Sequence, residues 1–377
     1  MRVLVAPDKF RGTLTAQQAA EAIASGWRRA RPRDLLDLAP MADGGEGTMD
    51  AVVGALRGEV FRRTVTGPLG DDVEAAYGIA DATAGRVAIV EMATASGSHL
   101  LNPTRRDPRR ATTRGTGELI GAALDHSPTQ LIVGLGGSAT NDGGAGMAQA
   151  LGVRLLDEHG VEIGSGGAAL TSLARVDATA IDARLHTVTC VAATDVDNPL
   201  TGWNGASAVY GPQKGATPDD VAFLDRALDH FAAMVYRDLG VDLRDEPGAG
   251  AAGGLGFGLM AFLGAHVRPG VDVVAEALDL SSLLAMADLA ITGEGRLDEQ
   301  SMRGKVPAGV LRLALEHAVP VVILCGEEGG PLGLDVPVRS LVERFGRDEA
   351  LGDARRCLER LAEETAGQIH ELVGGTT

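Results

Sequence analysis

The chain has 377 residues, of which 45% are hydrophobic and only 3% aromatic, and its formal net charge is −17. This length predicts two domains, with cores built from Ala, Val, Leu and Ile. The acidic balance argues against nucleic acid and anionic membranes as partners, because phosphate-rich surfaces attract basic proteins.

Cysteine usage and the apolar stretches indicate a cytoplasmic protein. The three cysteines, Cys190, Cys325 and Cys357, lie far apart and form no C-x-x-C pair, which is typical of reduced packing residues. The N-terminal segment MRVLVAPDKF has too short an apolar run for a signal peptide. The uncharged stretch that begins at Pro247 approaches membrane-spanning length, but its seven glycines favour a buried helix.

Strands and helices alternate in the first sixty residues. Residues 2–7 and 35–40 are strand-like, a helix is expected from Thr15 as N-cap to residue 29, and the loop DGGEGT at 43–48 leads into a second helix. From residue 61 the pattern changes to strands separated by turns, at 61–68, 72–80 and 86–93, with further strands at 153–157 and 186–200. A long amphipathic helix is expected over 218–238.

The last ninety residues return to alternating strands and helices. Strands are expected at 287–295, 320–326 and 336–343, and helices at 306–318 and 353–373. We therefore predict an α/β fold with two domains and a cleft between them. Residues 1–62 and 286–377 would form a doubly wound, Rossmann-like domain with a parallel sheet, and residues 63–285 an inserted mixed α/β domain.

A glycine-rich loop stands out in LIVGLGGSATNDGGAGMAQALG, residues 131–152. It follows an apolar strand and contains five glycines before an Ala-rich helix. A tight turn needs one or two glycines, so five indicate a loop whose N–H groups hold phosphate oxygens beside a helix N-terminus. The predicted nucleotide-binding residues are Gly136, Gly137, Ser138, Asn141, Asp142, Gly143 and Gly144.

The same loop also permits a different reading. The letters GLGGSA fit the dinucleotide pattern G-x-G-x-x-A, and Asp157 lies about twenty residues further on. An NAD(P)-dependent hydroxy-acid dehydrogenase is therefore an alternative, although NDGG interrupts the helix that should follow at once. A non-enzymatic nucleotide-binding sensor is another. The P-loop pattern is absent, because Glu299 replaces its first glycine and Val306 follows Lys305.

Lysine is unusually rare in this chain. It has 31 arginines but only three lysines, Lys9, Lys214 and Lys305, and each lies in a loop flanked by Gly or Pro. A lysine ammonium is a compact point charge that guanidinium cannot replace in a tight site, and it is a common phosphate ligand. We therefore expect all three lysines to be functional.

Charged residues and glycines also follow successive strands of the terminal domain. Ligands bind beyond the carboxyl ends of parallel strands, so these residues should share one edge of the sheet. They are Asp8, Lys9, Asp43, Gly293, Glu294, Arg296, Asp298 and Gly326. In the middle region Asp195 ends an apolar strand in ATDVDNPLTG, where a carboxylate suits a catalytic base or a Mg²⁺ ligand.

Several long segments form one ordered set along the chain: APDKFRGTLTA, MADGGEGT, GTGELI, GLGGSATNDGGAGMAQALG, DVDNPLTG, GPQKGAT, AAGGLGFG and ITGEGRLDEQSMRGKVPAGV. Together these segments resemble the bacterial type I glycerate kinase family. The resemblance runs from Arg2 to about Leu324. It implies ATP-dependent phosphorylation of D-glycerate with Mg²⁺, in two α/β domains, and 2-phosphoglycerate as the product rather than 3-phosphoglycerate.

The roles of individual residues follow from their chemistry. We expect the loop from Gly136 to Gly144 to hold ATP phosphates and Lys214 to neutralise charge during transfer. Lys9, a further predicted catalytic residue, would face this site from the other domain. Asp195 would orient the glycerate hydroxyl as a base or bind Mg²⁺. The predicted substrate-binding residues are Asp43, Arg296 and Lys305, with Arg296 suited to the substrate carboxylate through a bidentate pair.

Overall fold

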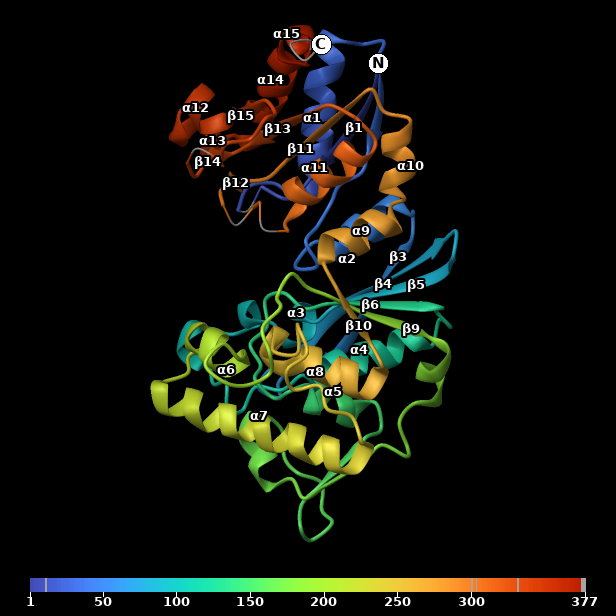
Figure 1. Ribbon diagram of the computed structural model, residues 1–377, viewed down its shortest axis with the longest axis vertical. Coiled ribbons are helices and arrows are strands. Elements are labelled where there is room, and N and C mark those ends of the chain that lie inside the picture. Colours follow the sequence, from blue (N-terminus) through green and yellow to red (C-terminus); the bar gives the residue numbers. More distant parts are fainter. Residues whose placement is uncertain (11, 300, 303, 331, 374–377) are drawn as a thin grey trace. The chain divides into compact units, whose positions relative to one another are not determined.

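The computed structural model describes residues 1–373 except 11, 300, 303 and 331 (Figure 1). The chain forms two compact units. Unit 1 comprises Met1–Asp43, Asp50–Ala55 and Pro269–Thr377, and unit 2 comprises Gly44–Met49 and Leu56–Arg268. The chain thus passes between units at 43/44, 49/50, 55/56 and 268/269. The sequence predicts domain boundaries at 62/63 and 285/286. The difference arises because the strand at Glu59–Thr66 joins the sheet of unit 2 and helices after residue 269 pack in unit 1.

Unit 1 contains a five-stranded sheet in which every neighbouring pair is parallel, in the order β15-β13-β11-β1-β2. Both chain ends supply its strands, which confirms the predicted doubly wound domain. The strands are β1 (Arg2–Pro7), β2 (Leu35–Leu38), β11 (Leu289–Gly293), β13 (Val321–Cys325) and β15 (Val338–Ser340). A two-stranded parallel pair, β12 (Arg296–Leu297) with β14 (Glu327–Glu328), lies outside this sheet.

Helices α1 (Ala16–Ala30) and α14 (Ala354–Gly367) lie side by side in unit 1 (Figure 1). Thr15 caps α1 in a capping box with Gln18, which confirms the predicted helix start. The two helices approach so closely that a Cβ at Gly26 would lie 1.9 Å from the main-chain oxygen of Glu359. Trp27 and other apolar side chains of α1 pack with those of α14, β1 and β11 in one core.

The remaining helices of unit 1 differ in two places from the expected elements. The predicted strand at 336–343 is divided into β15 and α12 (Leu341–Phe345), because the Ser340 side chain accepts the Glu343 N–H and begins a helix. The predicted closing helix at 353–373 is divided into two helices: α14 ends at Gly367, and α15 (Ile369–Val373) follows. The others are α2 (Thr48–Ala55), which crosses from unit 2, α9 (Gly270–Ala277), α10 (Leu280–Ala285), α11 (Val306–Glu316) and α13 (Arg347–Gly352).

Unit 2 is built on a mixed six-stranded sheet in the order β10-β9-β6-β5-β4-β3. Strands β5, β6, β9 and β10 run parallel, and β3 and β4 are antiparallel to their neighbours. The strands are β3 (Glu59–Thr66), β4 (Asp72–Ala82), β5 (Gly85–Glu91), β6 (Gln130–Gly134), β9 (Thr189–Ala193) and β10 (His266–Arg268). This mixed sheet confirms the expected inserted α/β domain.

Four helices of unit 2 contribute side chains to the same core as the glycine-rich loop. Helix α7 (Pro218–Leu239) confirms the predicted amphipathic helix and starts with a capping box from Thr217. Helices α4 (Arg114–Leu124), α5 (Ala145–Ala150) and α6 (Ala206–Tyr210) are shorter. Their apolar side chains and those of the sheet form one core that includes Met147, Phe231 and Phe257.

The uncharged stretch from Pro247 contains helix α8 (Ala251–Leu263), whose apolar side chains are largely buried. The expected buried glycine-rich helix is therefore confirmed. Its first turn is irregular, with positive φ at Ala252, Gly253 and Gly254. A Cβ at Gly253 would lie 1.9 Å from the Thr140 main-chain oxygen, so glycine lets α8 approach the glycine-rich loop. Throughout the described chain, every helix is too short or too polar to cross a lipid bilayer.

Candidate functional site

The glycine-rich loop has a tip, Gly136–Ser138, in which Gly137 is exposed and the other two residues are half-buried, followed by a buried segment, residues 139–148. Two backbone hydrogen bonds hold the tip, from Ser98 N to Gly137 O and from Ala139 N to Ser96 O, each 2.9 Å long. In the described part of the chain, the N–H groups of Gly136, Gly137 and Ser138 donate to no protein acceptor. Three successive unpaired N–H groups in a fixed turn can bind an anion.

The buried segment is held by Asp142, whose side chain is fully buried. Its carboxylate accepts hydrogen bonds from the N–H and hydroxyl of Thr113 at 2.8 and 2.9 Å, and from the N–H groups of Gly144 and Gly146 at 3.2 and 3.3 Å. Burial raises the pKa of Asp142, and these hydrogen bonds oppose the rise. The carboxylate therefore joins the loop to the start of α4 and faces no solvent.

Asn141 is also fully buried, and its Nδ2 donates to the Ser207 hydroxyl at 2.9 Å. Gly143 and Gly144 lie in the same buried segment and have positive φ. A Cβ at Gly143 would lie 2.8 Å from the Phe231 ring, and one at Gly144 would lie 3.0 Å from the Gly258 Cα. The structure thus accounts for Asp142, Gly143 and Gly144 through packing, whereas the buried Oδ1 of Asn141 has no hydrogen-bond partner among the described residues. Of the predicted nucleotide-binding set, only the tip reaches the surface.

Lys214 belongs to the same buried layer. Its side chain is 3% exposed, and its Nζ donates to the main-chain oxygen of Thr140 at 2.7 Å. Burial lowers the pKa of Lys214 to about 7, while the nearby Asp142 carboxylate raises it. Lys214 therefore supports the loop from inside unit 2.

The tip shares an edge of the sheet with Asp195. Gly134 at the end of β6 pairs with Ala193 at the end of β9, so the residues after both strands emerge side by side. Asp195 is exposed there. On the other side of β6, Gly134 pairs with Glu91 at the end of β5.

Glu91 is a buried carboxylate that sequence reasoning missed. It accepts hydrogen bonds from the N–H groups of Gly47 and Met49 at 3.0 and 2.8 Å, which fixes the DGGEGT loop against the sheet. A close approach accompanies this contact, since a Cβ at Gly136 would lie 2.7 Å from the Gly45 Cα. The available signal was a single charge at the end of the apolar run RVAIVEMA.

In unit 1, Asp8 and Glu294 follow the paired ends of β1 and β11. Pro7 pairs with Gly293, and Asp8 N donates to Gly293 O at 2.8 Å. Both side chains are buried, with exposures of 4% for Asp8 and 7% for Glu294. Asp43, which is half-buried, follows the neighbouring strand β2.

The charges of these carboxyl groups interact with one another. Burial and then the charge of Asp43 raise the pKa of Asp8 to about 7, with a smaller contribution from Glu294. The N–H of Lys9, which donates to Asp8 Oδ1 at 2.7 Å, and the Lys9 ammonium oppose this rise. The structure thus brings together Asp8, Lys9, Asp43 and Glu294, as the strand-end pattern predicts.

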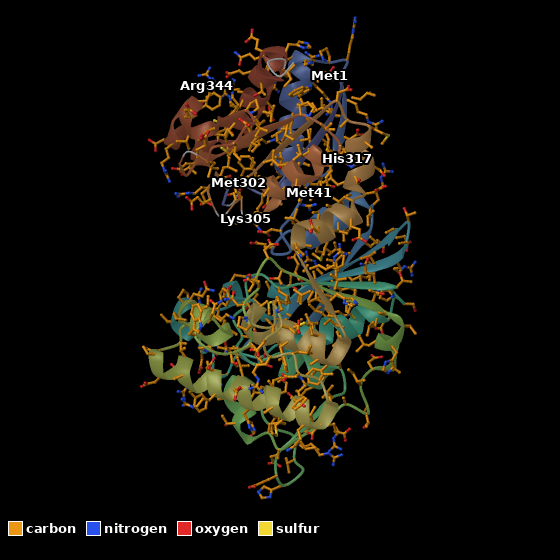
Figure 2. All side chains as sticks on the ribbon, in the orientation of Figure 1. Met1, Met41, Met302, Lys305, His317 and Arg344 are labelled. Atoms are coloured by element: carbon orange, nitrogen blue, oxygen red, sulfur yellow. The ribbon has the colours of Figure 1, made fainter. Side chains whose placement is uncertain are left out.

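Glu294 also interacts electrostatically with Lys305, which precedes α11 (Figure 2). Burial raises the pKa of Glu294, and Ser301 and Lys305 oppose the rise. Within the described residues, the buried Oε1 of Glu294 has no hydrogen-bond partner. Arg296 is more exposed than these groups: its side chain is 62% exposed and its Nε lies 3.7 Å from Oδ2 of Asp298, whose charge also acts on Glu294.

The glycines that accompany these charges have a packing explanation. A Cβ at Gly293 would lie 1.8 Å from the Leu324 main-chain oxygen, and one at Gly326 would lie 2.3 Å from the Gly295 oxygen. They permit close approach between neighbouring segments at the sheet edge. The carboxyl groups and lysines, and not the glycines, therefore mark this edge as a candidate site.

Metal binding by protein side chains alone finds no support in the part of the chain that the structure describes. No group of three His, Cys, Asp or Glu side chains there is placed to hold a metal ion. Mg²⁺ commonly keeps waters and binds through one or two carboxylates together with substrate phosphates. Asp195, which is exposed just after β9 on the strand next to β6, is one carboxylate of this kind.

The dinucleotide-binding alternative disagrees with the local structure. Residues 135–144 separate β6 from α5, whereas the dinucleotide fold begins its helix directly after the glycine turn. Asp157 follows β7 (Arg154–Leu156), which pairs with β8 (Arg175–Asp177) outside the six-stranded sheet. Its Oδ1 accepts the N–H groups of His159 and Val161, so it closes a turn.

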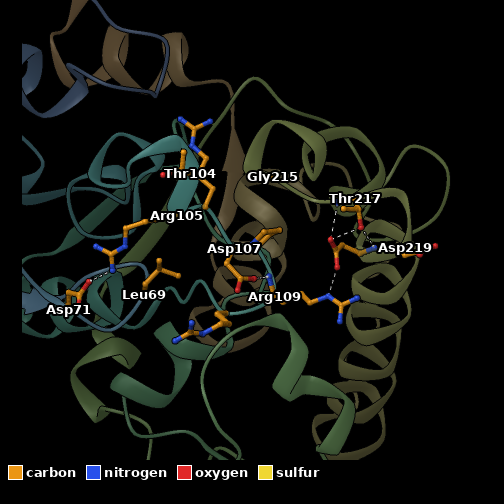
Figure 3. Close-up of a pocket in the computed structure, with 13 residues that line it drawn as sticks. Leu69, Asp71, Thr104, Arg105, Asp107, Arg109, Gly215, Thr217 and Asp219 are labelled. Carbon is orange, nitrogen blue, oxygen red and sulfur yellow. Dashed lines mark hydrogen bonds and ion pairs between the residues drawn. The ribbon is translucent and has the colours of Figure 1, made fainter.

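A cavity of about 890 Å³ in unit 2 is drawn in Figure 3. Arg105 pairs with Asp71 at 2.9 Å, and Arg109 pairs with Asp220. Four arginines and four aspartates line it, so their formal charges cancel; they are Arg105, Arg106, Arg109, Arg110, Asp71, Asp107, Asp219 and Asp220. None of the predicted site residues lines this cavity.

Comparisons with known proteins agree on one family. The model of the glycerate kinase family matches residues 3–373. The chain is 48% identical to the glycerate kinase of Bacillus subtilis (strain 168), with 98% of each chain covered. It is 47% identical to the glycerate 2-kinase of Escherichia coli (strain K12), covering 89% of this chain and 87% of that protein.

A solved structure shows the same fold. A crystal structure from Salmonella typhimurium LT2, assigned as a glycerate kinase 2, matches with a TM-score of 0.90 and 45% sequence identity, and 98% of each chain is covered. The sequence, the fold and the arrangement of the motifs thus point to one conclusion. This chain belongs to the glycerate kinase family.

Proposed function

We propose that this protein transfers the γ-phosphoryl group of ATP to the 2-hydroxyl of D-glycerate and forms 2-phosphoglycerate and ADP. Membership of the glycerate kinase family supports the enzyme class and the acceptor. The name glycerate 2-kinase, carried by a relative at 47% identity, supports the 2-hydroxyl over the 3-hydroxyl.

The observation that supports ATP is the loop tip with three unpaired N–H groups. Gly136, Gly137 and Ser138 would bind phosphate oxygens, because amide dipoles fixed in a turn stabilise negative charge without reorganisation. Asp195, on the adjacent strand end, would hold Mg²⁺ bound to the nucleotide phosphates. Mg²⁺ would supply charge neutralisation for phosphoryl transfer. Lys214 would act indirectly, by fixing the loop backbone from its buried side.

The carboxyl edge of the sheet in unit 1 supports glycerate binding. Lys9 and Lys305 place two ammonium groups near Asp8 and Glu294, and they would bind and neutralise the anionic substrate. Asp43 would accept a hydrogen bond from a substrate hydroxyl. Arg296 is exposed and would bind the substrate carboxylate through its guanidinium.

One coupled assay tests the function. Purified protein receives ATP, Mg²⁺ and D-glycerate, and ADP release is followed, while ³¹P NMR identifies the hydroxyl that is phosphorylated. We expect ADP release that requires all three components, and 2-phosphoglycerate as the product. A 3-phosphate product would contradict the proposed position of transfer.

Two matched experiments separate the alternatives. A nucleotide-binding sensor would bind ATP but show no glycerate-dependent ADP release. A dehydrogenase would change NAD(P)H fluorescence on titration and would ignore ATP. Either result would refute the kinase proposal.

A further inference from the structure

We infer that Asp8 is the general base of this enzyme: its carboxylate accepts the proton of the glycerate hydroxyl that is phosphorylated, while Glu294 accepts a hydrogen bond from the neighbouring hydroxyl. This inference rests on the proposed function and adds a chemical role within unit 1. The two residues follow the adjacent strands β1 and β11, whose ends are fixed by the pairing of Pro7 with Gly293.

Asp8 is held in a fixed position at the edge of the sheet. Its backbone N–H donates to Gly293 O at 2.8 Å, and its Oδ1 accepts the Lys9 N–H at 2.7 Å. The side chain is therefore held at the sheet edge with 4% exposure. A catalytic base needs such fixed placement, because proton transfer requires the reacting atoms to lie within hydrogen-bond reach.

One carboxylate oxygen of Glu294 is unpaired within the described residues, although the side chain also forms a hydrogen bond with Ser301. This side chain is 93% buried, since its exposure is 7%, yet Oε1 has no hydrogen-bond partner among the described residues. Its charge interacts with Asp43 and with Asp8, so it belongs to the same group. A buried acceptor without a donor costs stability, and a ligand that supplies a hydroxyl donor would satisfy it.

The carboxyl and ammonium groups at this edge of the sheet match one class of ligand. Carboxyl groups of Asp8, Asp43 and Glu294 accept hydrogen bonds from hydroxyls, and the ammonium groups of Lys9 and Lys305 attract a carboxylate. A small acid with two adjacent hydroxyls has both features. Glycerate is such a molecule, and a simple monocarboxylate is not.

The transfer forms one P–O bond and breaks another. The oxygen of the reacting hydroxyl forms a bond to the γ-phosphorus of ATP, and the bond between that phosphorus and the oxygen bridging to the β-phosphorus breaks. The hydroxyl proton passes to the Asp8 carboxylate, and ADP leaves with the electron pair of the broken bond. The pKa of Asp8, which burial and Asp43 raise to about 7, is suited to a base near neutral pH.

The test uses the full-length protein and three variants. Asp8→Asn keeps the shape and removes the base, and Glu294→Gln keeps one acceptor oxygen. The matched control is Asp37→Asn in the neighbouring strand β2, because among the described residues this carboxylate pairs with Arg2 alone, at 2.6 Å. For each protein we measure kcat, the KM for D-glycerate, the pH profile of kcat/KM and the thermal midpoint.

Asp8→Asn should lower kcat at least 100-fold and change the KM for D-glycerate less than fivefold, while Asp37→Asn should keep both within twofold. Glu294→Gln should raise the KM about tenfold. In the wild type kcat/KM should fall about tenfold per pH unit below pH 7, because the base must be deprotonated, and residual activity of Asp8→Asn should lack this acid limb. The groups that face Asp8 and can modify this limb are Lys9, Asp43 and Glu294.

Retention by Asp8→Asn of more than a tenth of wild-type kcat, or of the acid limb, would overturn the inference. If Asp8→Asn does not fold, the wild-type profile decides, and a flat profile between pH 5.5 and 8 would overturn it. A wild type that releases no ADP with D-glycerate would instead refute the proposed function. The two failures are therefore distinguishable.

Discussion

The Nζ of Lys214 donates a hydrogen bond to the main-chain oxygen of Thr140, at 2.7 Å, inside unit 2. One of only three lysines in the chain thus contacts the backbone of the glycine-rich loop from its buried side. Rarity of lysine predicts that a guanidinium would not serve at this position. The contact that the structure shows is with a main-chain oxygen and not with an exposed phosphate.

Lys214→Arg is therefore expected to destabilise the protein, although it keeps the charge. The larger guanidinium brings further N–H donors into a position that offers the Thr140 oxygen, and buried unsatisfied donors cost about 1–3 kcal/mol each. Urea denaturation should show a loss of at least about 2 kcal/mol in the free energy of unfolding. The control substitution Arg226→Lys, at an exposed position, should leave the free energy of unfolding unchanged. Equal stability of Lys214→Arg and wild type would contradict this prediction.

The lowered pKa of Lys214 predicts a pH-dependent stability. Its pKa is about 7 in the folded protein and 10.5 in the unfolded chain, so between these values the unfolded state binds more protons. Stability should rise with pH across this window, by about 1.4 kcal/mol per pH unit at most. The stability profile of Lys214→Met is subtracted from that of the wild type, which removes the contributions of the other titrating groups. A difference that is flat from pH 7.5 to 9.5 would disprove the lowered pKa of Lys214.

Much of the fold is predictable from local patterns. The helices that begin after Thr15 and Thr217 carry a capping residue and an apolar face, which act within one turn of the chain. The β-branched strands of both chain ends are similarly local signals. Helices α9 and α10 were not expected, and the position of the boundary near residue 269 depends on the contacts they make with α11, which are not encoded in a local period.

The site is less predictable because burial is a tertiary property. Asp142 and Asn141 look like polar loop residues in the sequence, but packing of α4, α6 and α8 encloses them. The strand-end pattern was more informative for Asp8 and Glu294, because parallel strands bring their carboxyl ends to one edge. Sequence alone could not show that Glu294 would be buried with an unpaired oxygen.

Gly136→Ala tests whether the loop tip must approach the DGGEGT segment. The added Cβ would lie 2.7 Å from the Gly45 Cα, and backbone must move to relieve this contact. We expect a loss of about 1–3 kcal/mol in stability and weaker ATP binding, measured by calorimetry. The matched control is Gly121→Ala in α4, where the Cβ meets no atom within 4 Å. This control should be neutral or stabilising by up to about 1 kcal/mol, since alanine favours a helix.

Asp195→Asn tests the proposed Mg²⁺ ligand at the end of β9. The amide keeps the shape and loses the negative charge, so it should bind the metal less well while the loop tip still binds phosphate. We expect kcat to fall at least 100-fold and the Mg²⁺ concentration needed for half-maximal rate to rise, with little change in the Kd for ATP measured without metal. Asp197→Asn is the matched control, because this exposed carboxylate lies two residues further along the same loop. Near-normal turnover of Asp195→Asn at low Mg²⁺ would remove Asp195 from the mechanism, and an equal loss in both variants would show that the loop's overall charge, rather than one ligand, is what matters.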